Sequence, residues 1–319
     1  MKKTKIMLLA AASLVISGAL LFAAVMTVCG WDFRKLNTSE FVNSSYEIAE
    51  EFYGVSVDSD TADIVFLPSD DGKCRVDCHE FEKSNHEVSV KDGKLNIKLN
   101  EQRKWYEQIF NIGSPKVNIY LPKTEYGALV LKNSTGDVTL PSDFTFESID
   151  ITASTGDVES RASAKGQIKI KLSTGDIKIE NVTAESLALT VSTGEIELRS
   201  VKTVGNVKIN VSTGEAELSG VSCKSLISKG TTGDISLNGV IATEKFSIER
   251  STGEVELDGC EAAEIFIKTS TGDVEGTLLS GKDFVAKSNT GDVYVPQNDA
   301  RGGRCEITTD TGDIKIRIV

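Results

Sequence analysis

The chain has 319 residues, of which 47 are acidic and 35 are basic, giving a formal net charge of -12. This excess of negative charge repels phosphate and anionic lipid, so we expect no nucleic-acid partner. Only 39% of the residues are apolar, which excludes a protein lying entirely within a membrane, and the 27 glycines indicate a turn-rich β protein.

The N-terminal segment is predicted to be a membrane anchor. Residues 6–31 carry no charged side chain, and this length exceeds the roughly 20 residues that a helix needs to cross a bilayer. Residues 1–5 contain three lysines, so the positive-inside rule predicts a single-pass protein of the cell membrane with a cytoplasmic tail and an extracytoplasmic β domain. A cleaved signal peptide is an alternative. Lipoprotein processing at Cys29 is a weaker one, because the β-branched Val28 precedes the cysteine.

Residues 32–49 are expected to be a linker, and residues 50–128 an N-terminal capping region. Within the cap, Thr61-Ala62-Asp63 is flanked by apolar residues in the pattern of the repeat described below, and it is predicted to be the corner of a degenerate first coil. A hairpin around Lys91-Asp92-Gly93-Lys94 and a strand over residues 117–121 are predicted to follow. Atypical end coils are typical of repeat proteins.

Two cysteines and two histidines in the cap raise the question of a zinc site. In a strand, Cys74 and Cys78 face one side and His79 faces the other, and residues four apart are separated by about 13 Å. One metal ion therefore cannot bind these residues together with His86. Buried free thiols are the favoured interpretation.

The segment 100–114 interrupts the strands with the one aromatic cluster of the chain. Trp105, Tyr106, Ile109 and Phe110 lie among charged residues. One interpretation is a short helix or loop that covers the end of the β domain. The functional interpretation is an exposed apolar patch, which makes these four residues the candidate partner-binding site.

The tripeptide Thr-Gly-Asp/Glu recurs at intervals of 19–21 residues, and its ten copies span the region 129–319. The glycines are Gly136, Gly156, Gly175, Gly194, Gly214, Gly233, Gly253, Gly272, Gly291 and Gly312. Apolar columns lie seven and five residues before each glycine and two and four residues after it, interrupted only by Ser160, Ser228 and Gly276. Polar residues alternate with these columns, which indicates two short strands per repeat.

Each pair of strands is predicted to be joined by a corner in which glycine takes the positive φ of a type II turn. Such a corner splays antiparallel strands, which favours an all-β fold, a β-solenoid of 19–20-residue coils, over an antiparallel meander. Ten coils stacked at the spacing of neighbouring strands would form a rod roughly 45–50 Å long.

An acidic residue follows every glycine of the repeat. Its aspartates are weak candidates for binding a divalent cation: Asp137, Asp157, Asp176, Asp234, Asp273, Asp292 and Asp313. Stacked carboxylates repel one another, and cations would relieve this repulsion. One carboxylate per coil supplies too few of the six to eight oxygens that calcium takes, so carboxylates that accept backbone N–H bonds at the corner are the favoured interpretation.

Three further cysteines and the last strand lie in the repeat region. Cys260 lies in a further apolar column seven residues after the glycine, with Val182 and Val201, and Cys305 lies in the first apolar column, so both are predicted to be buried. Cys223 is predicted to lie in a loop where it can be exposed. Residues 314–319 are predicted to be an uncapped edge strand through which the protein could self-associate, although Lys315 and Arg317 oppose this.

The sequence resembles a known family. The run VNIYLP at 117–122, LVL at 129–131, NSTGDV at 133–138 and the serial Ser-Thr-Gly-Asp corners behind an apolar helix resemble the bacterial putative-adhesin family of β-strand-repeat domains. The resemblance covers about residues 50–319. It implies a β-helix-like solenoid displayed outside a Gram-positive-type cell; the family has no known function, some relatives are linked to cell-envelope stress, and no catalytic residue is implied.

The sequence contains none of the common enzyme motifs, such as Gly-x-Ser-x-Gly, His-Glu-x-x-His, a phosphate loop or a dinucleotide fingerprint. We therefore expect no catalytic residue and no cofactor. The leading hypothesis is a non-enzymatic binding, adhesion or envelope-stress-sensing scaffold that engages cell-wall polymer, a cationic peptide or an envelope protein. A polysaccharide-active enzyme on a β-helix and a passive structural spacer are the alternatives.

Overall fold

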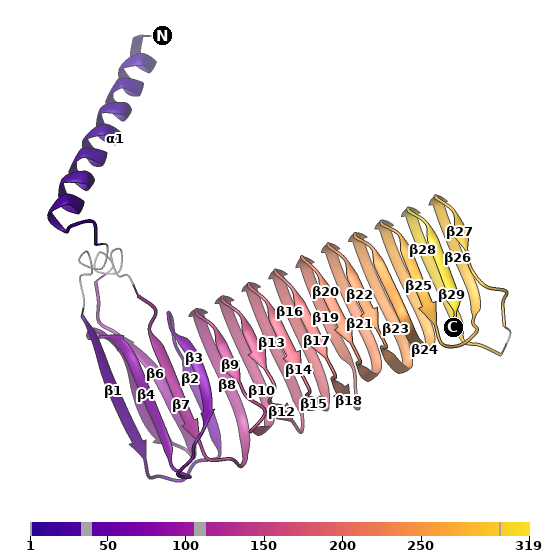
Figure 1. Ribbon diagram of the computed structural model, residues 1–319, viewed down its shortest axis with the longest axis horizontal. Helices are drawn as coiled ribbons and strands as arrows, with labels where there is room; N and C mark the ends of the chain where they lie inside the picture. Colours follow the sequence, from indigo (N-terminus) through magenta and orange to yellow (C-terminus); the bar gives the residue numbers. More distant parts are fainter. Residues whose placement is uncertain (1, 33–39, 105–112, 300) are drawn as a thin grey trace.

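The computed structural model describes residues 2–32, 40–104, 113–299 and 301–319. Helix α1 (Lys2–Val28) is followed by a long stack of β coils (Figure 1). The helix is long and apolar enough to cross a membrane, a test that a signal sequence also passes, and most of its side chains are exposed.

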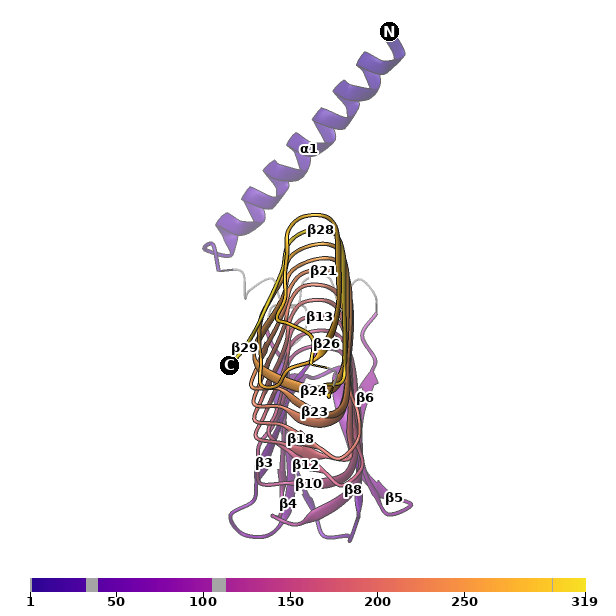
Figure 2. The ribbon, with the colours of Figure 1, turned by 90° about the vertical axis from the view of Figure 1, so that its right-hand side faces the viewer.

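The alternation of residue types explains the strands. In β13 (Gln167–Thr174), Ile168 and Ile170 are fully buried, whereas Lys169 and Lys171 are exposed. Because successive side chains of a strand point to opposite faces, each coil presents one apolar face. Figure 2, a view along the stack, shows that each coil is flattened, so the apolar faces of two opposed sheets meet in a narrow core.

The first sheet contains the strands that precede the corners. In spatial order they are β5 (Ser84–Lys91), β6 (Lys94–Glu101), β2 (Gly54–Asp58), β8 (Glu125–Thr135), β10 (Thr145–Thr155), β13, β16 (Ser186–Thr193), β19 (Val207–Thr213), β21 (Ser222–Thr232), β23 (Ile241–Thr252), the second half of β24 (Val255–Thr271), β28 (Arg304–Thr311) and β26 (Asp283–Thr290).

The second sheet contains the strands that follow the corners. In spatial order they are β1 (Phe41–Ile48), β4 (Cys74–Phe81), β7 (Lys116–Leu121), β3 (Asp63–Pro68), β9 (Val138–Leu140), β11 (Val158–Ser160), β14 (Ile177–Glu180), β17 (Ile196–Arg199), β20 (Ala216–Ser219), β22 (Ile235–Asn238), the first residues of β24, β25 (Val274–Leu278), β29 (Ile314–Ile318) and β27 (Val293–Tyr294).

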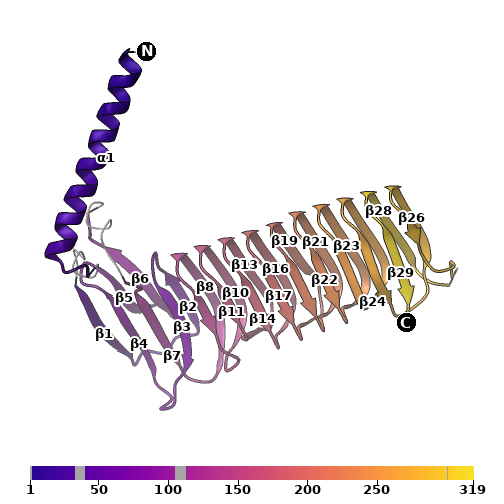
Figure 3. The same cartoon turned by 45° about the horizontal axis from the view of Figure 1, so that its top comes forward.

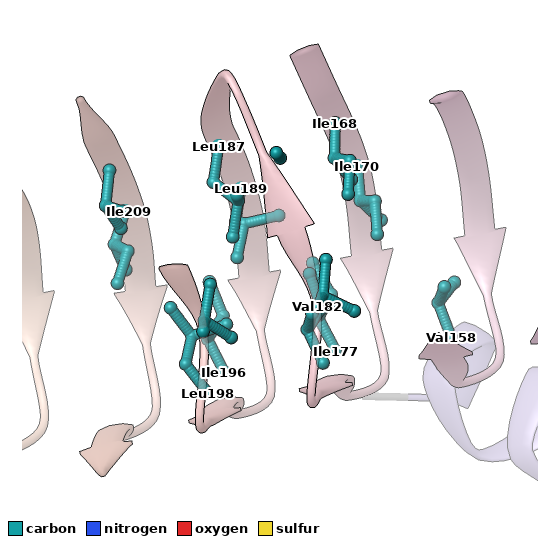
Figure 4. Close-up of a cluster of buried hydrophobic side chains, with 14 of the residues drawn as sticks. Val158, Ile168, Ile170, Ile177, Val182, Leu187, Leu189, Ile196, Leu198 and Ile209 are labelled. Atoms are coloured by element: carbon teal, nitrogen blue, oxygen red, sulfur yellow. The ribbon is translucent and has the colours of Figure 1, made fainter. Parts of the chain in front are cut away.

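A third, narrow side closes the middle coils. It is made of β12 (Ser163–Ala164), β15 (Thr183–Ala184), β18 (Lys202–Thr203) and the first residues of β21, and β23 and β24 continue it. The prediction of two strands per repeat was therefore incomplete. Val182, which leads into β15, is fully buried and lies among the core side chains from the two sheets (Figure 4).

Neighbouring coils pair in parallel and in register at the repeat interval. Ile168, for example, pairs with Ile149 in the coil before it and with Leu187 in the coil after it. Like residues therefore stack along the rod, and the predicted β-solenoid is confirmed.

Two of the three breaks in the apolar columns have a structural reason. Arg250 is buried and its Nη2 donates a hydrogen bond to Ser228 Oγ at 3.0 Å. Gly230 leaves room for that guanidinium, because a Cβ there would lie 2.5 Å from Arg250 Nη1. Gly276 has a φ of 146°, and a side chain there would meet the Leu257 carbonyl oxygen. Nothing in the structure explains Ser160.

The coils at the N-terminal end do not stack in chain order. The coil formed by β2 and β3 lies between the coil formed by β6 and β7 and the coil formed by β8 and β9. The Thr61-Ala62-Asp63 corner is confirmed, since Thr61 bridges to Thr135, but its coil is the second of the stack in space.

The C-terminal end shows the same arrangement. The last coil of the chain, β28 and β29, inserts between the coil of β24 and β25 and the coil of β26 and β27 (Figure 1). The prediction that residues 314–319 form the open edge is therefore wrong for Ile314 and Lys315, which pair with β27, whereas no described strand pairs with residues 316–318 on that side. The strands that end the stack are β26 and β27, where Tyr294 is 61% exposed.

Antiparallel strands complete the N-terminal end (Figure 3). The predicted hairpin is confirmed as β5 and β6, while β4 pairs antiparallel with β7 and β1 pairs antiparallel with β4. The expected linker over residues 32–49 thus contains a strand, because Phe41–Ile48 hydrogen-bonds along the full length of β4.

Candidate functional site

The corner glycines are required by the stacking itself. Their φ values, from 120° to 145°, exceed the roughly 80° of a type II turn, so that part of the prediction was wrong. A Cβ at Gly194 would lie 2.1 Å from the carbonyl oxygen of Gly175 in the neighbouring coil. Only glycine therefore allows two coils to approach at the corner.

The aspartates after these glycines form a ladder of hydrogen bonds. Asp176 N–H donates to Asp157 Oδ1 at 2.9 Å, and Glu195 N–H donates to Asp176 Oδ1 at 2.8 Å. The same bond is accepted by Asp137, Asp234, Asp273 and Asp313. Asp292 lies in the last coil in space, so no further corner stacks on it. These bonds agree with the favoured interpretation, in which the aspartates act as corner acceptors.

Like charges along this column shift the pKa of its glutamates. Partial burial, with the neighbouring Asp176 and Glu215, raises the pKa of Glu195 above its ordinary value. Partial burial and the flanking Asp234 and Asp273 raise the pKa of Glu254 in the same way. The column therefore stores electrostatic repulsion, although its aspartates also hold neighbouring coils together.

The cysteines of the β domain are buried. Cys74, Cys78, Cys260 and Cys305 lie in the core as predicted. Cys223 is also buried, at 4% exposure, because it belongs to the narrow third side at the start of β21. The prediction that Cys223 lies in a loop was therefore wrong. Burial raises the pKa of the Cys223 thiol to about 11.

A polar cluster lies inside the N-terminal end, between the two sheets. Cys78 and Glu80 of β4 and His86 of β5 are all buried, and one ligand atom of each lies within 4.8 Å of the others. The backbone N–H and Nδ1 of His86 bond Glu80 Oε2 at 2.9 and 2.7 Å, and His86 Nε2 contacts Ser59 Oγ at 3.0 Å. Cys74 and His79, the other members of the sequence candidate, do not join the cluster.

The polarity of this cluster was visible in the sequence. The two-residue alternation of a strand places Glu80 on the same face of β4 as Cys74, Val76 and Cys78. It places His86 on the same face of β5 as Val88 and Val90. A carboxylate and an imidazole in the phase of buried residues indicate a buried polar pair.

A pocket of about 780 Å³ opens beside the same end of the stack. It lies between the end of β1, the segment leading to β2 and the start of β8. Its aromatic residues are Phe52, Tyr53 and Tyr126, and the rings of Phe52 and Tyr126 stack with centroids 6.1 Å apart. Burial raises the pKa of Tyr126, whose hydroxyl donates to the Pro122 carbonyl at 2.8 Å.

The rim of this pocket is acidic. The exposed residues Glu47, Glu50, Glu51 and Glu125 line it, and Lys73 is the one cationic side chain of the lining. Glu125 is also paired with Lys165, at 2.7 Å. Aromatic faces beside carboxylates form an environment that suits an organic cation.

The aromatic candidates Trp105, Tyr106, Ile109 and Phe110 lie outside the described residues. The segment that contains them connects β6 to β7, the place that a corner occupies in other coils. Their role as a partner-binding site stays a prediction.

The fold and these sites define a β-solenoid with an N-terminal apolar helix and a pocketed end cap. Residues 54–210 and 202–319 match the family described as Toastrack DUF4097, and the chain belongs to this family. The resemblance to the bacterial putative-adhesin family is confirmed. Comparison with curated proteins finds no match.

Solved structures also resemble the chain. One is a "putative adhesin" from Bacteroides fragilis, with 18% identity and a TM-score of 0.42, covering 88% of this chain and 99% of its own. Another "putative adhesin", from Parabacteroides merdae, has 10% identity and a TM-score of 0.49 over 88% and 98% of the two chains. A "putative lipid binding protein" from Parabacteroides distasonis has 15% identity and a TM-score of 0.45 over 86% and 97%.

Proposed function

We propose that the protein is a non-enzymatic binding scaffold at the cell envelope, held by helix α1 with its solenoid outside the cell. The lysines of residues 1–5 support this orientation, because positive charge is retained on the cytoplasmic side. The regular coils extend from the N-terminal cap as a rod.

The pocket beside the N-terminal cap carries the proposal. It combines the partly exposed rings of Phe52 and Tyr53 with four rim glutamates. A lysine or arginine side chain over such a ring gains about 0.5–1 kcal/mol at an exposed site. The carboxylates add attraction that salt screens. The ligand class that fits is a basic peptide, or a basic segment of an envelope protein.

Calorimetric titration of the full chain in detergent tests this proposal. A lysine-rich peptide should bind, an acidic peptide of equal length should not, and the affinity should fall as salt is raised. Tyr53→Ala and Glu51→Gln should weaken binding, whereas Glu264→Gln, which removes an exposed glutamate of β24, should not. Equal binding by all three variants would contradict the pocket assignment, and no binding at all would favour the passive spacer.

Adhesion and envelope-stress sensing make different predictions for cells. An adhesin predicts loss of surface attachment when the chain is deleted. A sensor of envelope stress predicts altered survival in cationic antimicrobial peptides, with attachment unchanged.

A further inference from the structure

We propose that Cys78, Glu80 and His86 bind one zinc ion inside the N-terminal cap. The three side chains come from two strands that belong to opposite sheets, β4 and β5, and each is at most 2% exposed. Their ligand atoms lie within 4.8 Å of one another. In a tetrahedral zinc site, sulfur, nitrogen and oxygen ligands lie roughly 3.3–3.7 Å apart, so small side-chain movements bring them into place.

The carboxylate of Glu80 provides an independent reason to expect an occupant. Oε2 accepts two hydrogen bonds from His86, but Oε1 is buried and has no partner among the described residues. A buried polar atom left unpaired is destabilising, and such atoms in native proteins often mark an ion or an ordered water. A metal ion on Oε1 would satisfy it while the backbone bond from His86 is kept.

The donor set selects the kind of ion. A thiol and an imidazole disfavour magnesium and calcium, which prefer oxygen ligands. Sulfur, nitrogen and carboxylate oxygen together suit zinc, and three protein ligands leave a fourth position open. Zinc binding by the Cys78 thiol replaces its proton: the Zn–S bond forms, one proton leaves to solvent, and no electron is transferred.

The location gives the ion a structural role. β4 and β5 pair directly only at Phe81 and Ser84, next to the turn that joins them. A zinc ion bound by Cys78, Glu80 and His86 would link β5, the end strand of the first sheet, to β4, which lies next to the end strand β1 of the second sheet. This role is independent of ligand binding in the neighbouring pocket.

Titration of the chelator-treated full chain with Co²⁺, in detergent, tests the proposal. We expect a thiolate-to-cobalt charge-transfer band that saturates at one equivalent, is lost on addition of Zn²⁺, and accompanies a zinc-dependent rise in melting temperature. Cys78→Ala should abolish the band. Glu80→Gln and His86→Asn should weaken binding by at least about ten-fold, the smallest loss typical even for outer partners of a metal site.

Cys74→Ala is the matched control, because Cys74 lies on the same buried face of β4 four residues earlier and is outside the cluster. It should retain the band and the zinc-dependent rise. Circular dichroism of each variant shows whether it folds, and Cys78→Ser replaces Cys78→Ala if the latter does not. Absence of a band in the wild-type chain, or an undiminished band in the folded Cys78 variant, would overturn the proposal.

Discussion

Replacement of one corner glycine by alanine tests whether the repeat is fixed by backbone contact between coils. In Gly194→Ala the new Cβ would lie 2.1 Å from Gly175 O, whereas real contacts stay above 3.0 Å. The coils must therefore separate by about 0.9 Å at the corner. The φ of 138° adds backbone strain of about 1–3 kcal/mol for any residue except glycine.

Three hydrogen bonds cross this corner and would be stretched. Gly175 N–H donates to Thr193 O at 3.1 Å, Ile177 N–H to Glu195 O at 2.9 Å and Glu195 N–H to Asp176 Oδ1 at 2.8 Å. Each contributes about 0.5–1.5 kcal/mol. Together with the strain, Gly194→Ala should lower the free energy of unfolding by about 3–7 kcal/mol.

Gly220→Ala is the control for positive φ without a clash. Gly220 has a φ of 62°, the nearest atom to a Cβ added there would lie 3.9 Å away, and Asn181 and Ser200 take the same conformation at the equivalent place in earlier coils. We expect a loss of only about 1–2 kcal/mol there. Urea unfolding of the full chain in detergent measures both variants, with hydrogen exchange at the corner amides as a local readout. A Gly194→Ala loss no larger than the Gly220→Ala loss would refute the reasoning.

Three further predictions concern the same rod. The pKa of Glu195 is raised, so its ionised form destabilises the folded state above that pKa. Glu195→Gln should therefore raise the free energy of unfolding by about 0.2–0.5 kcal/mol at pH 7 and leave it unchanged near pH 3. An equal gain at both pH values would exclude charge repulsion as the cause. Asp176→Ala should lower the unfolding free energy by about 0.5–1.5 kcal/mol through the Glu195 N–H bond, and Asp176→Asn by less, which thermal melts compare. Cys223 and Cys305, with pKa values raised by burial to about 11 and about 12, should react with a thiol reagent at pH 8 only after unfolding; rapid labelling of the folded chain would contradict their burial.

The sequence was sufficient to predict the repeating unit. Period-2 alternation in segments such as Gln167–Thr174 specifies a half-buried strand, and the Thr-Gly-Asp corner specifies where it ends. The narrow third side was also encoded, because Val182 and Val201 form a further apolar column. That column was recognised as buried but was not assigned to a strand.

The spatial order of the coils was not predictable from the pattern. The apolar columns of the last three coils are nearly interchangeable, so Ile265 can pair as well with Phe284 as with Cys305, its neighbour in the structure. The cluster of Cys78, Glu80 and His86 was predictable only in part, for a related reason. Cys78 and His86 lie on different strands, and only the fold shows that Glu80, rather than Cys74 or His79, completes their group.

The insertion of the last coil has a consequence for how the molecule matures. Strands can be added in their final positions as the chain is synthesised, but only as far as β25. The segment 283–294 can take its final place only later, because its neighbour in the finished stack is residues 304–318, which emerge after it. The rod is therefore completed only when residues 304–318 are present. A product that ends before β28 would lack the strands with which β26 and β27 pair in the finished stack. Its unpaired strands would make it a target for proteolysis.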